Sequence, residues 1–369
     1  NSILVLNAQD LLKFSVNIEN DIPFPMSVSL DGINYNMDKN SLVLYELNQG
    51  SEKRINSQLE SGHSARLWFI LDGQKSANEV RHFVLRAEAT TQNQETAIKL
   101  SKNLTDLNLS FNNKSILNYR FGLIYPPDSI VPWFSKNIHN LKKKGAYLHP
   151  VWSPGGEVLT QIQALDHPHH FGIWGPWTKT KIGERKLDFW DLSLGLGTVN
   201  FDGFLSQTEG NVFSGFKALQ NHMDFGANGE DQIAFNEILD VRVWNIGEGI
   251  WMIDYTSSLS TALETGVLFE KYRYGGGIGF RATEKWKAST STIFTSEGKN
   301  RQNADATNAR WCIVEGVSGV SEGRSGILFM SHPSNRSHPE PMRIWPSSMN
   351  DLYFQFSPIK QEAWKLEQN

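Results

Sequence analysis

The sequence predicts an all-β protein, and three observations lead to this class. Apolar and polar residues alternate in short runs, whereas the 3.6-residue period of helices is scarce. The runs are separated by Gly, Asn, Asp, Ser and Pro, which favour turns. Their spacing is typical of a β-sandwich. The clearest expected strands cover residues 42–47, 82–87, 107–111, 115–122, 156–163, 238–244 and 251–258.

A length of 369 residues suggests two domains. Residues 1–104 are expected to form a small sandwich of immunoglobulin-like size, with turn signals at Pro23, Pro25 and Asp31. Residues 105–369 are expected to form one large β-sandwich that carries the active site.

The large domain is expected to begin with a hairpin around Asn112 and Asn113. Residues 96–104 and 137–144 are minor helix candidates, and the lysines at 142–144 are interpreted as a solvated face. No closing strand is expected after residues 353–356.

The composition excludes several classes of partner. A net charge of −4 provides no basic field for nucleic acid or anionic lipid. No apolar run reaches the roughly 18–20 residues that a membrane span requires. The single cysteine, Cys312, excludes an internal disulfide and a Cys-rich zinc site, and its apolar strand favours an inert thiol. The 12 Trp, 9 Tyr and 21 Phe favour carbohydrate, because aromatic faces bind sugar rings.

The densest group of chemistry-bearing residues is Asp166-His167-Pro168-His169-His170. On an ideal strand, His167 and His169 share one face, and Asp166 and His170 share the other. Two converging imidazoles suit metal ligation or proton transfer. The alternative is a set of histidines that only form hydrogen bonds within a loop.

Two residues near this motif are candidates for the same site. His149 could join the histidines across a hairpin, or have a purely structural role. Asp188 could orient an imidazole, ligate a metal or act as an acid, and the alternative is an aspartate that caps a turn.

A second group of candidates runs from Glu270 to Glu284 and contains three consecutive glycines. Its glycine spacing matches a dinucleotide fingerprint, but the required strand–loop–helix context is missing. We interpret the segment as backbone that approaches a ligand closely, or as a bulged strand. Glu270, Tyr274 and Arg281 would then bind sugar hydroxyls or an acidic group, and the alternative is surface ion pairing.

Arg310 and His332 are further candidates for substrate contact at the rim of the site. His332 lies in a Pro-rich stretch that could equally be an ordered loop. The sequence contains no Gly-x-Ser-x-Gly elbow, Walker loop, His-Glu-x-x-His or EF-hand motif.

These stretches resemble the family known as PmoA-like, a domain of unknown function found in bacterial carbohydrate-degradation loci. The resemblance covers roughly residues 106–357. A link to methane oxidation is rejected, because that enzyme is a membrane protein and this chain shows no span. The resemblance implies a β-sandwich similar to the galactose-mutarotase type, with the histidines on a concave face. It rests on Leu148-His149-Pro150, Ser153-Pro154-Gly155-Gly156, Asp166 to Trp174, Asp188-Phe189-Trp190, Tyr274 to Arg281, Ala309-Arg310-Trp311 and His332-Pro333.

The leading hypothesis is a secreted or periplasmic enzyme, or one at the cell surface, that acts as a glycoside hydrolase on oligosaccharides in polysaccharide degradation. His167, His169 or His170 handles protons or holds a cation, and Asp188 or Glu270 supplies the carboxylate. The other contacts to the substrate are expected from His149, Trp174, Trp177, Trp190, Tyr274, Arg281, Arg310 and His332.

Two alternatives remain open at this point. A histidine could instead drive β-elimination or epimerisation beside a carbonyl or uronate, with Tyr274 or an arginine stabilising the product. The chain could also bind glycans without catalysis. No cofactor is certain, although a divalent metal is compatible with the histidines.

Overall fold

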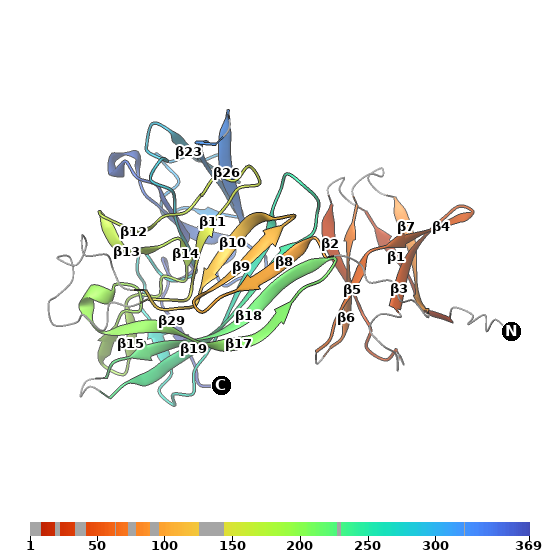
Figure 1. Cartoon of the computed structure of the whole chain (residues 1–369). Coiled ribbons are helices and arrows are strands. Elements are labelled where there is room, and N and C mark those ends of the chain that lie inside the picture. The colour runs from red at the N-terminus through yellow and green to blue at the C-terminus, as the bar shows by residue number, and fades with distance from the viewer. Residues whose placement is uncertain are drawn as a thin grey trace. The chain divides into compact units, whose positions relative to one another are not determined.

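A computed structural model describes residues 9–18, 23–33, 42–62, 64–72, 79–88, 96–124, 144–226, 230–320 and 322–369. Strands dominate these residues, and their only helical elements are the 3-10 turns η4 (Leu192–Leu194) and η5 (Ser347–Met349) (Figure 1). The predicted all-β sandwich class is confirmed. None of the described helices is long and apolar enough to cross a membrane.

The chain divides into two compact units. The first contains Asn1–Lys99 together with two later segments, Thr208–Gly215 and Arg242–Ile253, and the second contains the rest. The later segments join the first unit through specific contacts. Gln58 Oε1 accepts hydrogen bonds from the backbone of Val212 and Phe213, both at 3.0 Å. The first unit is therefore discontinuous in sequence, which the sequence patterns did not indicate.

The first unit contains two antiparallel sheets, with strand orders β1-β7-β3-β4 and β2-β6-β5. Alternate apolar side chains of both sheets form one core that includes Leu44, Leu67, Phe69 and Phe83. The strands are β1 (Gln9–Asn17), β2 (Phe24–Ser29), β3 (Leu42–Asn48), β4 (Ser51–Ile55), β5 (Ser57–Glu60), β6 (Arg66–Leu71) and β7 (Val80–Ala87).

The second unit is built on a nine-stranded sheet of order β24-β27-β28-β22-β14-β11-β10-β9-β8. Its strands are β8 (Ile98–Lys102), β9 (Asp106–Phe111), β10 (Lys114–Arg120), β11 (Tyr147–Val151), β14 (Ile173–Trp174), β22 (Ile278–Arg281), β24 (Asn308–Ala309), β27 (Glu340–Ile344) and β28 (Tyr353–Phe356). Four smaller sheets accompany it, with orders β12-β13, β16-β15-β21-β29, β17-β18-β19-β20 and β23-β25-β26.

The strands of the smaller sheets in this unit vary widely in length. They are β12 (Ile162–Ala164), β13 (His167–Phe171), β15 (Thr180–Ile182), β16 (Arg185–Leu187), β17 (Gly197–Thr208), β18 (Phe213–Asp224), β19 (Gln232–Trp244), β20 (Met252–Ser260), β21 (Val267–Phe269), β23 (Ser291–Thr295), β25 (Trp311–Val317), β26 (Arg324–Met330) and β29 (Trp364–Leu366).

An aromatic layer joins the nine-stranded sheet to the long strands of the β17-β18-β19-β20 sheet. Tyr119 on β10 stacks on Phe216 of β18, with ring centroids 4.6 Å apart. Phe121 packs against Phe201 of β17 at 4.9 Å. The two sheets therefore face each other as a sandwich, the arrangement that alternating apolar residues favour.

Most expected strands are found close to their predicted bounds, as is the hairpin at Asn112 and Asn113. Both asparagines have positive φ, 46° and 65°, as a tight two-residue β-turn of this hand requires. The segment at 156–163 is irregular apart from single bridges at Val158 and Thr160 and the start of β12, so the continuous strand predicted there is wrong. Its Gly156 has a φ of 90°, which interrupts an extended conformation.

Three other expectations need correction. The helix expected at 96–104 is the strand β8, because Ile98 is buried while Lys99 is exposed in the alternation of a strand. A strand does close the chain: β29 pairs with β21. Lys144 is buried rather than solvated. The rest of the helix expected at 137–144 lies outside the described residues.

Candidate functional site

Strand β13 brings three imidazole rings together. The ring centroids of His167 and His170 are 4.9 Å apart, those of His169 and His170 are 5.1 Å apart, and those of His167 and His169 are 5.5 Å apart. The alternation predicted for an ideal strand, with His170 on the opposite face, is therefore wrong. The β12–β13 pairing is irregular, and Gln163 has a φ of 47°, so the short ribbon does not present two clean faces.

His167 forms a carboxylate–imidazole pair with Asp166. The Nδ1 atom of His167 donates a hydrogen bond of 2.9 Å to Oδ2 of Asp166. Oδ1 of Asp166 accepts a hydrogen bond of 2.8 Å from Nη2 of Arg281 on β22. Although burial opposes it, the hydrogen bond from His167 and the charge of Arg281 hold the pKa of Asp166 well below its usual range. The ionised Asp166 carboxylate accepts the hydrogen bond from Nδ1 and so orients the His167 ring with Nε2 away from Asp166.

His170 is completely buried among aromatic rings. Its ring centroid lies 4.9 Å from that of Tyr353 and 5.3 Å from those of Trp174 and Trp345. Neither of its ring nitrogens has a hydrogen-bond partner among the described residues. Burial is the main cause that lowers the pKa of His170 far below its usual range, so the imidazole is neutral.

His169 completes the cluster and is partly exposed. Its ring contacts Trp190 at 5.3 Å, and its backbone oxygen accepts a hydrogen bond from Nε1 of that tryptophan. Burial, only partly opposed by the nearby Asp191 carboxylate, lowers the pKa of His169 to about 4. At neutral pH this imidazole is also uncharged.

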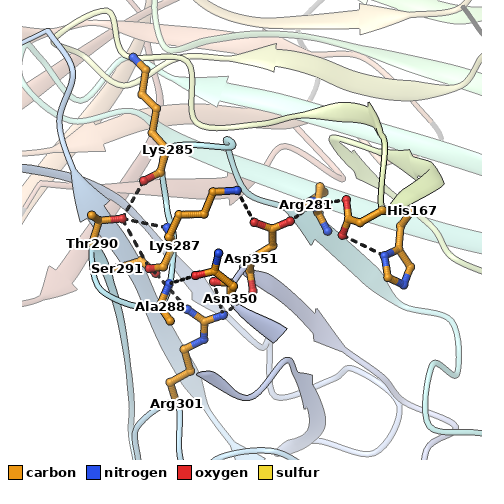
Figure 2. Close-up of polar contacts among 11 residues, drawn as sticks. His167, Arg281, Lys285, Lys287, Ala288, Thr290, Ser291, Arg301, Asn350 and Asp351 are labelled. Atoms are coloured by element: carbon orange, nitrogen blue, oxygen red, sulfur yellow. Dashed lines mark hydrogen bonds and ion pairs between the residues drawn. The ribbon is translucent and has the colours of Figure 1, made fainter. Parts of the chain in front are cut away.

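Arg281 links the histidines to a second carboxylate and to a buried polar network, which Figure 2 shows. Its Nη2 atom also donates to Oδ2 of Asp351 at 2.9 Å, and Asp351 in turn pairs with Lys287. Only 1% of Arg281 is exposed, and its guanidinium lies 5.0 Å from the centre of the Trp345 ring. A buried cation with two carboxylate partners has a fixed position.

Arg301 positions the segment that carries Trp345 and Asp351. It donates hydrogen bonds to the backbone oxygen of Trp345 at 3.1 Å, to that of Asn350 at 3.1 Å, and to that of Asp351. A further hydrogen bond of 3.2 Å reaches Ser291 on β23 (Figure 2). Arg301 therefore holds two neighbours of Arg281 in place without touching the histidines itself.

Asp188 adopts the turn-capping alternative rather than facing the histidines with a free carboxylate. Oδ1 accepts hydrogen bonds from the backbone of Trp190 at 2.9 Å and of Asp191 at 2.8 Å, and Oδ2 accepts one from Thr178. Burial raises its pKa. Its contribution to the site is to fix Trp190, which packs against His169 and His170.

Glu270 and Trp177 were expected in the site, but their contacts are with residues outside the histidine cluster. Glu270 forms an ion pair of 2.6 Å with Lys181 of β15, beside the end of β21. Trp177 packs against Phe269 of β21 and Phe235 of β19 in a hydrophobic core. No contact between either residue and the histidines occurs among the residues that the structure describes.

The glycine-rich segment brings Tyr274 and Arg281 to the cluster. The Tyr274 hydroxyl accepts hydrogen bonds from Nε1 of Trp345 at 2.9 Å and from Arg343 at 3.1 Å. The glycines approach protein rather than a ligand. A Cβ atom at Gly276 would collide with the Trp177 ring, and Gly276 has a φ of 65°, so the tight backbone packing needs glycine there.

The three remaining candidates lie away from the cluster. The His149 ring is hydrogen-bonded to Thr160 at 2.8 Å, and burial lowers its pKa to about 4. Arg310 is exposed between β24 and β25. His332 is exposed, and its Nδ1 atom accepts a hydrogen bond from the backbone of Ser334, as in a turn.

A metal centre finds no support in the donor set. Nδ1 of His167 is bonded to Asp166, and His170 is enclosed by aromatic rings. Across the described ranges, no group of three or more His, Cys, Asp or Glu side chains is arranged to hold an ion.

Sequence reasoning missed several residues of the cluster. Trp345, Tyr353 and Asp351 contact the histidines or Arg281, and Arg301 holds the backbone of Trp345 and Asp351. They lie more than 100 positions after the histidine motif. The only available signal was the aromatic and charged character of the segment from Arg343 to Phe356.

The fold and site define the class as an all-β sandwich protein with a buried histidine–arginine cluster. Residues 106–369 match a family of unknown function, DUF6807. The match covers well over half of the chain, so the chain belongs to this family. A search among curated proteins finds no match.

Proposed function

We propose that the chain is a carbohydrate-active enzyme in which His167 moves a proton. One observation carries this proposal: the Asp166 carboxylate accepts a hydrogen bond from Nδ1 of His167 and is itself held by buried Arg281. This arrangement leaves Nε2 as the proton acceptor on a side chain that is 28% exposed. An oriented imidazole beside a carboxylate is a common general base.

The arrangement favours proton abstraction from a carbon next to a carbonyl group. Nε2 of His167 takes the proton, and the electrons of the C–H bond move into an enolate. In an elimination these electrons form a C=C bond, the glycosidic C–O bond at the β carbon breaks, and the departing oxygen takes up a proton. In an epimerisation a proton returns to the same carbon from the other side. Neither route needs an oxidant or reductant.

Hydrolysis by a pair of carboxylates receives less support. Asp188 has hydrogen bonds to both oxygens, and Glu270 is paired with Lys181. The two carboxylates that bind Arg281, Asp166 and Asp351, both accept hydrogen bonds from its Nη2 atom. Because its pKa is strongly lowered, Asp166 cannot hold a proton for general-acid catalysis at neutral pH.

Carbohydrate as the substrate class is supported by the aromatic surroundings of the site. Trp190 packs against the ring of His169, which is partly exposed, and indole faces often contact sugars. Degradation of polysaccharides outside the cytoplasm, in the periplasm or after secretion, is part of the same proposal.

The test is to incubate the protein with neutral, uronic and sulfated oligosaccharides and to weigh the products by mass spectrometry. Elimination gives unsaturated fragments without added water, whereas hydrolysis adds one water for each bond cleaved. Epimerisation leaves the mass unchanged and is read by NMR.

The matched variants are His167→Asn and His332→Asn. The first should lose at least a hundredfold in turnover, and the second should keep wild-type turnover because His332 lies outside the cluster. Equal turnover in the two variants contradicts the role of His167. Cleavage that adds one water for each bond supports a glycoside hydrolase. Binding of an oligosaccharide without any product supports a glycan-binding protein.

A further inference from the structure

The histidine cluster contains an unusual set of buried polar atoms without partners. They are Nδ1 and Nε2 of His170, Nε1 of Trp174, Nε and Nη1 of Arg281, and Nε of Arg343, and none has a hydrogen-bond partner among the described residues. Buried polar groups in proteins are nearly always hydrogen-bonded, and each exception costs about 1–3 kcal/mol.

The four residues that carry these atoms are contiguous. The His170 ring contacts Trp174 at 5.3 Å and Trp345 at 5.3 Å, and the Arg281 guanidinium lies 5.0 Å from the same Trp345 ring. Arg343 reaches this group through Tyr274, whose hydroxyl accepts hydrogen bonds from both Arg343 and Trp345. These six atoms therefore lie on neighbouring residues of one cluster, whereas the other buried atoms without partners in the described structure, such as Nε1 of Trp286, belong to residues elsewhere.

The unpartnered atoms are mostly donors. The tryptophan and both arginines can only donate, and neutral His170 adds one N–H and one acceptor nitrogen. Two of the donor groups are cationic guanidinium groups. A ligand that satisfies this set must supply acceptors, and a negatively charged oxygen forms the strongest hydrogen bonds with a guanidinium.

The charges of the adjoining network agree with an anionic ligand. Arg281, Lys287 and Arg301 are cations, and Asp166 and Asp351 are carboxylates. Arg301 is 4% exposed, and its hydrogen bonds go to three backbone oxygens and one serine hydroxyl. A ligand carboxylate would balance this third positive charge in the network.

We infer that the site binds an acidic sugar, with its carboxylate accepting hydrogen bonds from the unpartnered N–H groups of Arg281. This inference rests on the site described under the proposed function and adds the class of its ligand. A carboxylate in this position also lies near His167, whose partner Asp166 is bound to the same arginine.

The test measures binding rather than turnover. Trimers of galacturonic, glucuronic and mannuronic acid are titrated calorimetrically into the wild-type protein, each beside its methyl ester, which keeps the sugar and removes the charge. We expect at least one acid to bind about tenfold or more tightly than its ester, the gain typical of one charge-assisted contact. Equal or tighter binding of every ester overturns the inference, as does no binding by any acid at millimolar concentration.

Arg281→Gln should abolish the preference for the acid over the ester, whereas Arg310→Gln, at an exposed arginine outside the site, should preserve it. If Arg281→Gln does not fold, the acid–ester pair on the wild-type protein still decides the question. Binding of an acid that stays chemically unchanged contradicts the proposed enzyme but supports this inference. Turnover of a neutral sugar, with no binding of any acid, supports the proposed enzyme but contradicts this inference.

Discussion

Two buried histidine groups in the second unit are alike in burial and differ in their partners. His222 on β18 bonds through Nε2 to Glu237 on β19 at 2.8 Å, and Ser257 donates to the other oxygen of Glu237 at 2.6 Å. The His222 ring also stacks on Phe235, with centroids 3.9 Å apart. His170 on β13 is equally buried, yet both of its nitrogens are without partners among the described residues.

Under our proposal, the difference separates a structural histidine from one that belongs to a ligand site. A buried imidazole bonded to a carboxylate offsets part of its desolvation cost, so only Nδ1 of His222 is left without a partner among the described residues. His170 carries that cost without compensation from the protein. It lies beside His167, which has a carboxylate partner and is partly exposed. Two unsatisfied buried nitrogens next to a partly exposed imidazole agree with our proposal that this cluster binds a ligand.

The largest expected difference lies between two matched variants, in which the carboxylate bonded to His167 or the one bonded to His222 is replaced by an amide. Asp166→Asn should lower turnover by a factor of roughly 10² to 10⁴, because His167 loses the acceptor that fixes its tautomer. Glu237→Gln should leave turnover within about threefold of wild type. Steady-state rates on the substrate found by mass spectrometry decide this, and equal losses in both variants would remove the distinction.

The same replacement at the two buried rings should change stability in opposite directions. His222→Phe breaks the bond to Glu237 and should lower the free energy of unfolding by about 2 kcal/mol. His170→Phe removes two unpartnered nitrogens from an aromatic surrounding and should raise it by about 1 kcal/mol. Urea unfolding monitored by circular dichroism measures both. A loss at His170 as large as that at His222 would show that His170 also has a structural partner.

Stability should fall as the pH drops from about 6.5 towards 4. Burial lowers the pKa of each of four histidines, His149, His169, His170 and His222, below the ordinary value of 6.5. In this window the unfolded chain binds more protons than the folded protein, so acid favours unfolding. A pKa lowered to about 4, as for His149, corresponds to a loss of about 3 kcal/mol in the free energy of unfolding once the pH lies below that value.

Two buried carboxyl groups with raised pKa, Asp188 and Glu340, oppose this trend, but the histidines outnumber them. Thermal unfolding at pH 7, 6, 5 and 4 gives the dependence of the melting temperature on pH. His170→Phe and His222→Phe should each flatten it, and a constant melting temperature over the range would contradict the burial of the histidines.

The smallest expected effect lies at the exposed end of the network in Figure 2. Lys287 pairs with Asp351, but 38% of its side chain is exposed, so the pair contributes at most about 1 kcal/mol. Lys287→Met should therefore change the free energy of unfolding and the turnover only slightly, and less so at high salt. A loss comparable to that of Asp166→Asn would place Lys287 in direct contact with the substrate.

Local patterns predicted much of the fold. Alternation of apolar residues indicated β3, β7, β9, β10, β19 and β20, and Asn112-Asn113 indicated the turn between β9 and β10. The helix at 96–104 was wrong because a short polar segment with few apolar residues does not distinguish the two periods. The strand at 156–163 was wrong because Ser153 and Gly156 close a turn there, with the Gly156 N–H bonded to the Ser153 oxygen.

The candidate site was predicted in part. His167, His169, His170, Trp174, Trp190, Tyr274 and Arg281 do meet in the structure. Asp188 and Glu270 were selected as carboxylates of the right chemistry, but a side chain's partners depend on its neighbours in space. Asp188 caps a turn, and Glu270 pairs with Lys181.

The sequence by itself determined the all-β class and the position of the histidine motif, because these follow from local periodicity and from the residues themselves. Only the tertiary structure decided which carboxylate serves which histidine. Asp166 pairs with its own neighbour, while Arg281, Asp351 and Trp345 come from strands and turns more than 100 residues away. Hydrogen bonds and desolvation depend on distances of a few ångströms in space. The number of residues between two positions in the chain does not reveal how close their side chains lie.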